Sequence, residues 1–88
     1  MTDKDKVSEK IKQLLSKTLK KKVSKIEENS SLRSIGLDSI SMIDLIVRLE
    51  IEFSIKIANE EVKAEIFKSS ASLSEFVAKK LVKQIIND

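Results

Sequence analysis

Asp38 and Ser39 stand shortly after Gly36, the only glycine of the chain, and directly before a run of apolar residues. Glycine permits a sharp turn, and Asp and Ser are good N-cap residues, so a helix is predicted to begin at this pair. In the simplest interpretation, Ser39 is a plain helix cap.

The chain has no histidine to activate Ser39 as a nucleophile, and nothing indicates a Ser-Lys pair. Any chemistry at Ser39 would therefore be the acceptance of a group that another enzyme transfers. A phosphoester would be well placed there, because a helix N-terminus presents free N–H groups and a positive dipole end to an anion.

The helix predicted to follow, which ends near Phe53, is apolar on two faces. At about 100° per residue, one face is an ordinary core stripe of Met42, Leu45, Ile46, Leu49 and Phe53. The second face consists of Ile40, Ile43, Val47 and Ile51, beside the acids Asp44, Glu50 and Glu52. Either the preceding connection covers this second face, or it is exposed as an acid-rimmed binding surface. A chain of this size has little other apolar surface to cover it, which favours exposure.

Three further helices complete the prediction. The first spans residues 3–19, from an apolar stripe of helical period formed by Val7, Ile11, Leu14, Leu15 and Thr18. The long connection after it should be anchored in the core at Val23, Ile26, Leu32 and Ile35. Asn59 is predicted to cap a short third helix over Glu60–Phe67. A Ser72–Glu75 capping box should open the last helix, whose apolar stripe is Leu73, Phe76, Val77, Leu81 and Ile85.

The composition favours one all-α domain, residues 1–88. The absence of proline, tryptophan and tyrosine argues against a β-sandwich or barrel. Without cysteine or histidine, neither a disulfide nor a metal site is expected. No apolar run could span a membrane, and the N-terminus lacks the apolar stretch of a signal peptide, so a cytoplasmic protein is predicted.

The net charge of +3 is unevenly distributed along the chain. Residues 1–35 carry +5, residues 36–54 carry −3 and residues 55–88 carry +1. A basic chain with an acidic middle is not typical of a simple polyanion binder. The acidic middle segment, which contains Ser39, is therefore the more informative part.

The run GLDSI, followed by an apolar and acid-rimmed helix, resembles the acyl and peptidyl carrier proteins. These proteins hold 4′-phosphopantetheine on the serine of a (D/N/H)-S-(L/I) motif. The resemblance covers nearly the whole chain, because it includes the first helix, the connection with NSSL, the run LIVRLEIEF, the segment IKI and the capped last helix. It implies a four-helix bundle of the acyl-carrier type, with three long helices and one short third helix.

The resemblance also implies functional roles. Ser39 would carry 4′-phosphopantetheine, delivered from coenzyme A by a phosphopantetheinyl transferase, and Asp38 would precede it at the cap. Partner enzymes would read the surface residues of the next helix, which are Ile40, Ile43, Asp44, Val47, Arg48, Glu50 and Ile51. The partners would be the transferase, an acyl- or aminoacyl-loading enzyme, and downstream synthases and transferases. The protein itself would be a monomeric, non-catalytic carrier, since the reactive thiol belongs to the arm.

The chain departs from the fatty-acid members of the family. It is positively charged overall, Arg48 stands where a small residue is usual, and Ile51 interrupts an acidic run. These departures favour a free-standing carrier in a dedicated polyketide, fatty-acid-like or specialised pathway. The alternative within the family is an aminoacyl or peptidyl carrier of a nonribosomal pathway.

Two other classes of protein are alternatives. A helical adaptor would use the second apolar face to bind a partner helix, with Ser39 only a cap. Nucleic-acid binding through Lys20–Lys22 and the first helix is disfavoured, because the chain has two arginines and only three aromatic residues for stacking. Neither a nucleic acid nor a membrane is an expected partner.

Overall fold

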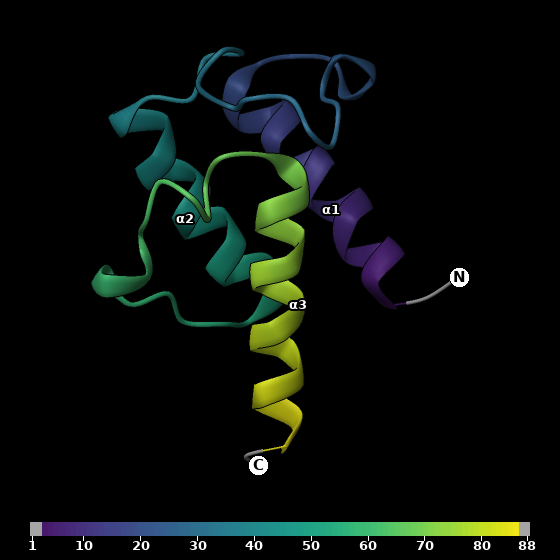
Figure 1. Cartoon of the computed structure of the whole chain (residues 1–88), viewed down its shortest axis with the longest axis vertical. Helices are drawn as coiled ribbons and strands as arrows, with labels where there is room; N and C mark the ends of the chain where they lie inside the picture. Colours follow the sequence, from purple (N-terminus) through teal and green to yellow (C-terminus); the bar gives the residue numbers. More distant parts are fainter. Residues whose placement is uncertain (1–2, 87–88) are drawn as a thin grey trace.

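The computed structural model describes the backbone of residues 3–86 and the side chains of residues 5–83. Three α-helices form the body of the molecule, α1 (Asp3–Leu19), α2 (Ser39–Phe53) and α3 (Ser70–Ile86). Two short 3₁₀ helices, η1 (Val23–Lys25) and η2 (Asn59–Glu61), lie in the connections. Figure 1 shows α1 packed behind α2 and α3, with the connection from α1 to α2 crossing one end of the molecule. The all-α prediction is confirmed, and residues 3–86 contain no strand.

The apolar stripes predicted from the helical period form the core. α1 packs against both α2 and α3, and its Ile11 and Leu15 are fully buried. The matching side chains of the other helices, Leu45, Leu49, Leu73 and Val77, are fully buried too. Met42, Ile46 and Phe53 of α2, and Phe76 and Leu81 of α3, pack against this core while partly exposed. The predicted core position Ile85 lies outside the described side chains.

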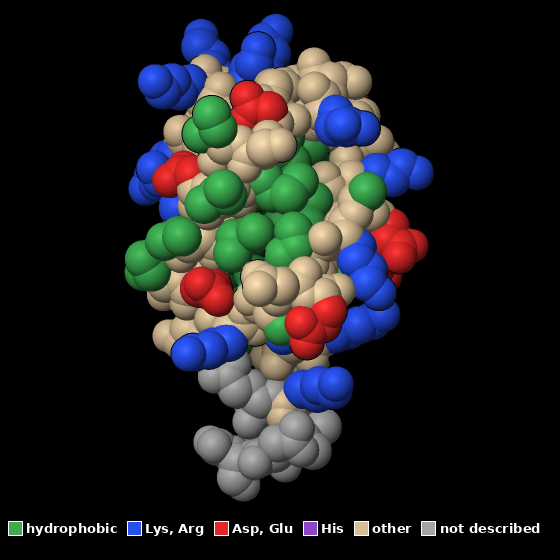
Figure 2. Space-filling view, turned by 90° about the vertical axis from the view of Figure 1, so that its left-hand side faces the viewer, with side chains coloured by type: hydrophobic (Ala, Val, Ile, Leu, Met, Phe, Trp, Pro, Cys, Tyr) green, Lys and Arg blue, Asp and Glu red, His purple; other side chains and the backbone are tan. Residues whose placement is uncertain are grey.

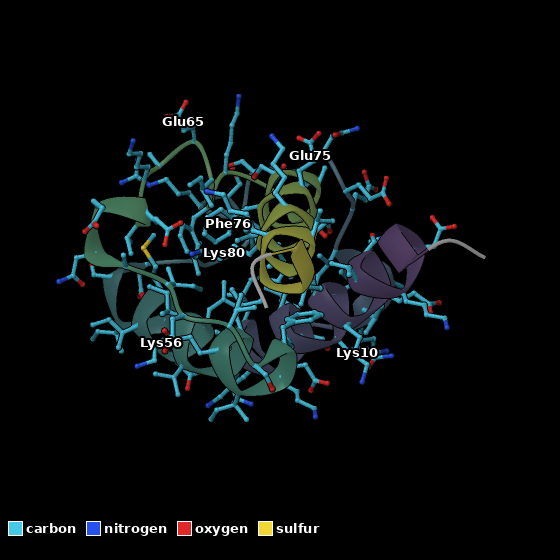
Figure 3. All side chains as sticks on the ribbon, turned by 90° about the horizontal axis from the view of Figure 1, so that it is seen from below. Lys10, Lys56, Glu65, Glu75, Phe76 and Lys80 are labelled. Atoms are coloured by element: carbon cyan, nitrogen blue, oxygen red, sulfur yellow. The ribbon has the colours of Figure 1, made fainter. Side chains whose placement is uncertain are left out.

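The prediction of a short third helix is wrong, because the structure forms only η2 and a separate turn in place of a helix over Glu60–Phe67. The backbone of Val62 leaves the helical region at φ −82° and ψ 80°. Asn59 is not the cap. The N–H of Ala58 donates to the Glu61 carboxylate at 2.9 Å, and this carboxylate also pairs with Lys80 of α3 at 2.7 Å. The segment is therefore held by contacts with α3 together with the hydrogen bonds of η2 and of the turn, and not by a continuous α-helix. Lys80 also lies 5.6 Å from the ring centroid of Phe76, and both side chains point from α3 toward this segment (Figure 3).

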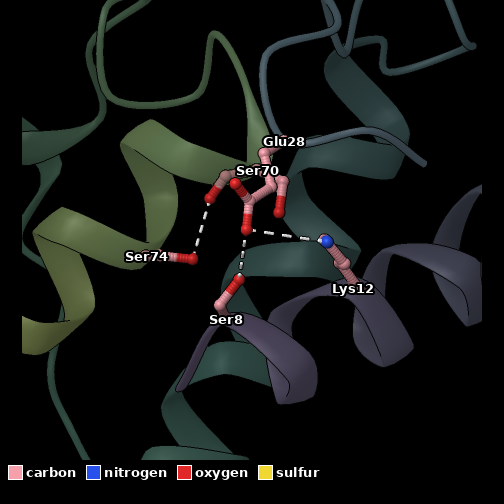
Figure 4. Close-up of polar contacts among 5 residues, drawn as sticks. All are labelled: Ser8, Lys12, Glu28, Ser70 and Ser74. Carbon is pink, nitrogen blue, oxygen red and sulfur yellow. Dashed lines mark hydrogen bonds and ion pairs between the residues drawn. The ribbon is translucent and has the colours of Figure 1, made fainter. Parts of the chain in front are cut away.

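The connection from α1 to α2 is anchored, as predicted, at Ile26 and Leu32, which are buried, and at Ile35, which packs against the core. The prediction is wrong for Val23, which is exposed. Polar contacts hold the connection as well. Glu28 accepts a hydrogen bond from Ser8 at 3.3 Å and pairs with Lys12 at 3.7 Å (Figure 4).

Backbone hydrogen bonds join the same connection to the start of α3. The N–H of Ala71 donates to the Glu28 carbonyl, and the N–H of Leu32 donates to the Lys68 carbonyl, both at 2.9 Å. α3 begins at Ser70, so the predicted Ser72–Glu75 capping box is wrong. The box is formed one turn earlier, where Ser69 and Ser72 exchange hydrogen bonds between side chain and backbone at 3.0 and 3.2 Å. Closely spaced serines permit several cap positions, and these long-range contacts select one of them.

Candidate functional site: the first turn and outer face of α2

The turn into α2 depends on Gly36, as predicted. Its φ of +115° is a backbone conformation that residues with a side chain rarely adopt. The N–H of Leu37 donates to the Leu32 carbonyl at 2.9 Å and closes this turn. Leu37 is buried, so it fixes the entry of the chain into α2. The turn thus presents the next two residues, Asp38 and Ser39, at the surface.

Asp38 is the N-cap of α2, as predicted. Its carboxylate accepts the N–H of Ser41 at 2.8 Å, and its own N–H donates to the Ser41 hydroxyl at 2.8 Å. These reciprocal hydrogen bonds form a capping box with serine in the third helical position. Ser41 was not predicted from the sequence, although its place three residues after Asp38 is the signal that could have identified it.

The capping hydrogen bonds hold the pKa of Asp38 below its ordinary value, chiefly through the backbone N–H of Ser41 and then through its hydroxyl. A carboxyl with a lowered pKa in the folded state stabilises the fold above its unfolded pKa, and this contribution is lost as the pH falls. We expect the melting temperature of the wild type to fall more steeply below pH about 4 than that of Asp38→Asn, which keeps a capping oxygen but does not titrate. Parallel slopes in thermal melts from neutral to acidic pH would contradict the role of this carboxylate.

Ser39 is the first residue of α2, and its side chain is exposed. Because Asp38 and Ser41 form the cap, the cap interpretation of Ser39 is wrong. Its hydroxyl makes no hydrogen bond to any residue that the structure describes. An exposed and unengaged hydroxyl in the first turn of a helix fits the attachment of a phosphorylated group, because the helix dipole favours an anion there.

A pocket of about 600 Å³ opens beside Ser39, between the first turn of α2 and the segment 62–68 that precedes α3. We call it the Ser39 pocket. Its apolar lining comes from Leu37, Met42, Val62, Ala64 and Phe67. Figure 2 shows an apolar hollow on this side of the molecule, with both basic and acidic side chains around it. The residues present can therefore accommodate a group attached to Ser39.

The second apolar face of α2 is exposed, which is the alternative that the small size of the chain favoured. The exposed fractions are 81% for Ile40, 66% for Ile43, 48% for Val47 and 75% for Ile51. The other interpretation, in which the preceding connection covers this face, is wrong. Four branched aliphatic side chains at helical spacing thus form an unpartnered surface, which we call the α2 outer face.

The acids near the α2 outer face differ in their contacts. Asp44 forms an ion pair with Arg48 one turn later at 2.8 Å, and Glu52 pairs with Lys10 of α1 at 2.9 Å. Glu50 is half-buried, and its carboxylate accepts the backbone N–H of Ile57 at 2.9 Å. Glu50 therefore holds the chain that leaves α2, a role that sequence reasoning missed because it depends on a contact outside the helix.

We expect Glu50→Lys to lower the free energy of unfolding by about 1–3 kcal/mol, because it leaves the Ile57 N–H without its acceptor. Asp44→Lys removes only an exposed ion pair and should cost less than about 1 kcal/mol. Urea unfolding of both variants beside the wild type measures the difference. Equal losses would contradict the structural role of Glu50.

Comparisons with known proteins identify the family of this chain. Residues 9–78 match the family model described as "Phosphopantetheine attachment site". The acyl carrier protein of Buchnera aphidicola subsp. Schizaphis graminum is 43% identical over 56 residues, which are 62% of this chain and 71% of that protein. Among solved structures, a chain in the crystal structure of Bradyrhizobium japonicum glycine:[carrier protein] ligase complexed with glycylated carrier protein matches with a TM-score of 0.64 at 23% identity. That match covers 84% of this chain and 97% of the other, and it supports the fold.

The chain belongs to the phosphopantetheine-attachment family of carrier proteins. It is a carrier of acyl groups, with covalent 4′-phosphopantetheine as its prosthetic group, and the family is not catalytic. Over residues 3–86, no helix is both long and apolar enough to cross a membrane.

Proposed function

We propose that Ser39 is the residue that carries the 4′-phosphopantetheine arm. The observation that supports this most is the exposed Ser39 hydroxyl, which the Asp38–Ser41 capping box leaves unengaged at the start of α2. A phosphopantetheinyl transferase would form the bond between Ser39 Oγ and the phosphorus of the arm. The nucleotide portion of coenzyme A would leave, and the hydroxyl proton would pass to a base on the transferase. The terminal thiol of the arm supplies the thioester chemistry.

The experiment is intact mass spectrometry after incubation with coenzyme A, Mg²⁺ and a promiscuous phosphopantetheinyl transferase, followed by fragmentation to locate the added mass. We expect one phosphopantetheine per chain, on the peptide that contains Ser39. Addition on another serine would overturn the assignment. No addition to the folded protein would favour the adaptor alternative, for which the α2 outer face is the supporting feature.

The α2 outer face is the proposed docking surface for the transferase, for the loading enzyme and for downstream enzymes. The supporting observation is the exposure of Ile40, Ile43, Val47 and Ile51 in the helix that begins at the attachment serine. Asp44 and Arg48 lie on the same helix and would set the orientation of a partner through charge. Glu50 stays part of this proposed surface, although one oxygen of its carboxylate accepts the N–H of Ile57.

A pair of aspartate substitutions tests the docking surface. Ile43→Asp should slow transfer of the arm and leave the melting temperature nearly unchanged, because Ile43 is exposed. The control is Val82→Asp, which changes an exposed apolar residue of α3 in the same way. If the two variants were modified at the same rate, the α2 outer face would not be the surface that the transferase binds.

For the cargo, we propose a small acyl or aminoacyl group of a dedicated pathway, carried by a free-standing monomer. The net charge of +3 supports a pathway other than bulk fatty-acid synthesis. The fold shared with a glycylated carrier protein is compatible with an aminoacyl cargo. Loading assays with purified ligases from neighbouring genes would distinguish the two kinds of cargo.

A further inference from the structure

Three cationic side chains, Arg33, Lys63 and Lys68, line the Ser39 pocket. They come from both sides of it, Arg33 from the connection before α2 and the two lysines from the segment before α3. Within the described side chains, none of the three forms an ion pair. These three positive charges at the margin of the pocket therefore have no ion-pair partner among the described side chains.

Two acids also line the pocket, so its lining holds three cations and two carboxylates, a net charge of +1, and neither acid forms an ion pair with these cations. The Asp38 carboxylate is engaged by the N–H and the hydroxyl of Ser41 in the capping box. Glu65 points outward from the tip of its segment (Figure 3). The margin is thus suited to one further anionic group, and the floor beneath it is apolar.

We propose that Arg33, Lys63 and Lys68 form a clamp for the phosphodiester of the arm, and that the clamp seats the adjoining part of the arm in the Ser39 pocket. The inference rests on the proposed attachment at Ser39, which itself lines this pocket. A phosphodiester formed there carries a negative charge beside the three cations. One methylene group further along the arm is a carbon bearing two methyl groups, and the apolar floor provided by Met42, Val62 and Phe67 suits it.

Covalent attachment makes weak contacts sufficient for this docking. A tethered group has an effective concentration on the order of millimolar, so contacts too weak to retain free phosphopantetheine can still hold the arm. The cations are exposed, so their attraction to the phosphodiester is screened by salt. The arm should accordingly rest in the pocket at low salt and leave it readily when a partner competes for it.

The test compares amide NMR spectra of the full-length apo and holo proteins, after mass spectrometry has confirmed one arm per chain. In the wild type we expect arm-dependent shifts at Val62, Ala64 and Phe67 as well as beside Ser39. Raising the salt from about 0.01 M to about 1 M, which shortens the Debye length from about 30 Å to about 3 Å, should reduce the shifts at the first three residues. The triple variant Arg33→Gln, Lys63→Gln and Lys68→Gln should reduce them at low salt.

The matched control is Lys21→Gln, Lys22→Gln and Lys25→Gln, which removes the same charge from exposed residues outside this pocket. It should retain the wild-type shifts. Shifts confined to residues 38–40 in the wild type would overturn the proposal, because the arm would then be free in solvent. Shifts that resist both salt and the clamp substitutions would overturn the role of the cations. Failure of attachment would appear in the mass spectrum first and would disprove the Ser39 assignment instead.

Discussion

A Ser39→Ala variant should accept no phosphopantetheine and should therefore carry no acyl group, while its stability stays within about 0.5 kcal/mol of the wild type. The chemical effect is complete, because alanine has no oxygen to bond to the phosphorus. The effect on folding is small, because the Ser39 hydroxyl is exposed and Asp38 and Ser41 supply the cap. Intact mass after transferase treatment and a urea unfolding curve measure the two effects separately.

Ser41→Ala is the matched control, since it removes a hydroxyl from the same helical turn. It should lower the free energy of unfolding by about 1 kcal/mol, because the capping box loses one of its two members. It should still accept the arm. A modified Ser39→Ala protein, or an unmodified but folded Ser41→Ala protein, would place the attachment site elsewhere than Ser39.

The second large effect concerns folding. Leu45→Ala should lower the free energy of unfolding by about 2–5 kcal/mol, the usual range for a buried leucine. Leu45 is fully buried where α2 faces the other helices. Its loss removes apolar surface from the core and leaves a cavity that the three helices cannot close. Urea or thermal unfolding of the apo protein gives the value.

Ile43→Ala serves as its control, two residues away on the same helix. Ile43 is mostly exposed, so its truncation should cost no more than about 0.5 kcal/mol. Comparing the free energies of unfolding of the two variants therefore distinguishes the buried face of α2 from its exposed face. Comparable losses for both variants would mean that the outer face is packed against the protein, and the docking proposal would fail with it.

The parts of the fold that were predicted from the sequence are those set by local periodicity. α1 has the predicted bounds, and both faces of α2 follow from the helical spacing of its apolar residues. Ser39 and Asp38 were identifiable because Gly36, the cap residues and the apolar helix stand next to one another in the chain. The attachment role of Ser39 stays a prediction that mass spectrometry must test.

The errors fall where contacts between distant residues decide the local structure. Glu61 is held by Lys80 of α3, and no short-range pattern shows that the chain around it adopts a turn instead of a helix. The start of α3 depends on the hydrogen bond from Ala71 to the Glu28 carbonyl, which selects among several serines. The hydrogen bond that Glu50 accepts from Ile57 was also missed, because this contact lies outside the helix.

The two backbone hydrogen bonds that join the connection to the start of α3 have a consequence for dynamics. The Leu32 N–H and the Ala71 N–H each donate to a residue far away in the sequence. Neither bond can be broken by fraying of a single helix, since each requires two separate segments to part. Their amide protons should therefore exchange with solvent only in openings as large as global unfolding. The amide protons of Lys25 and Ile26, bonded within η1 and its end, should exchange through local openings. Slow exchange at Leu32 and Ala71 would thus give a direct reading of the stability of the whole carrier, independent of whether the arm is attached.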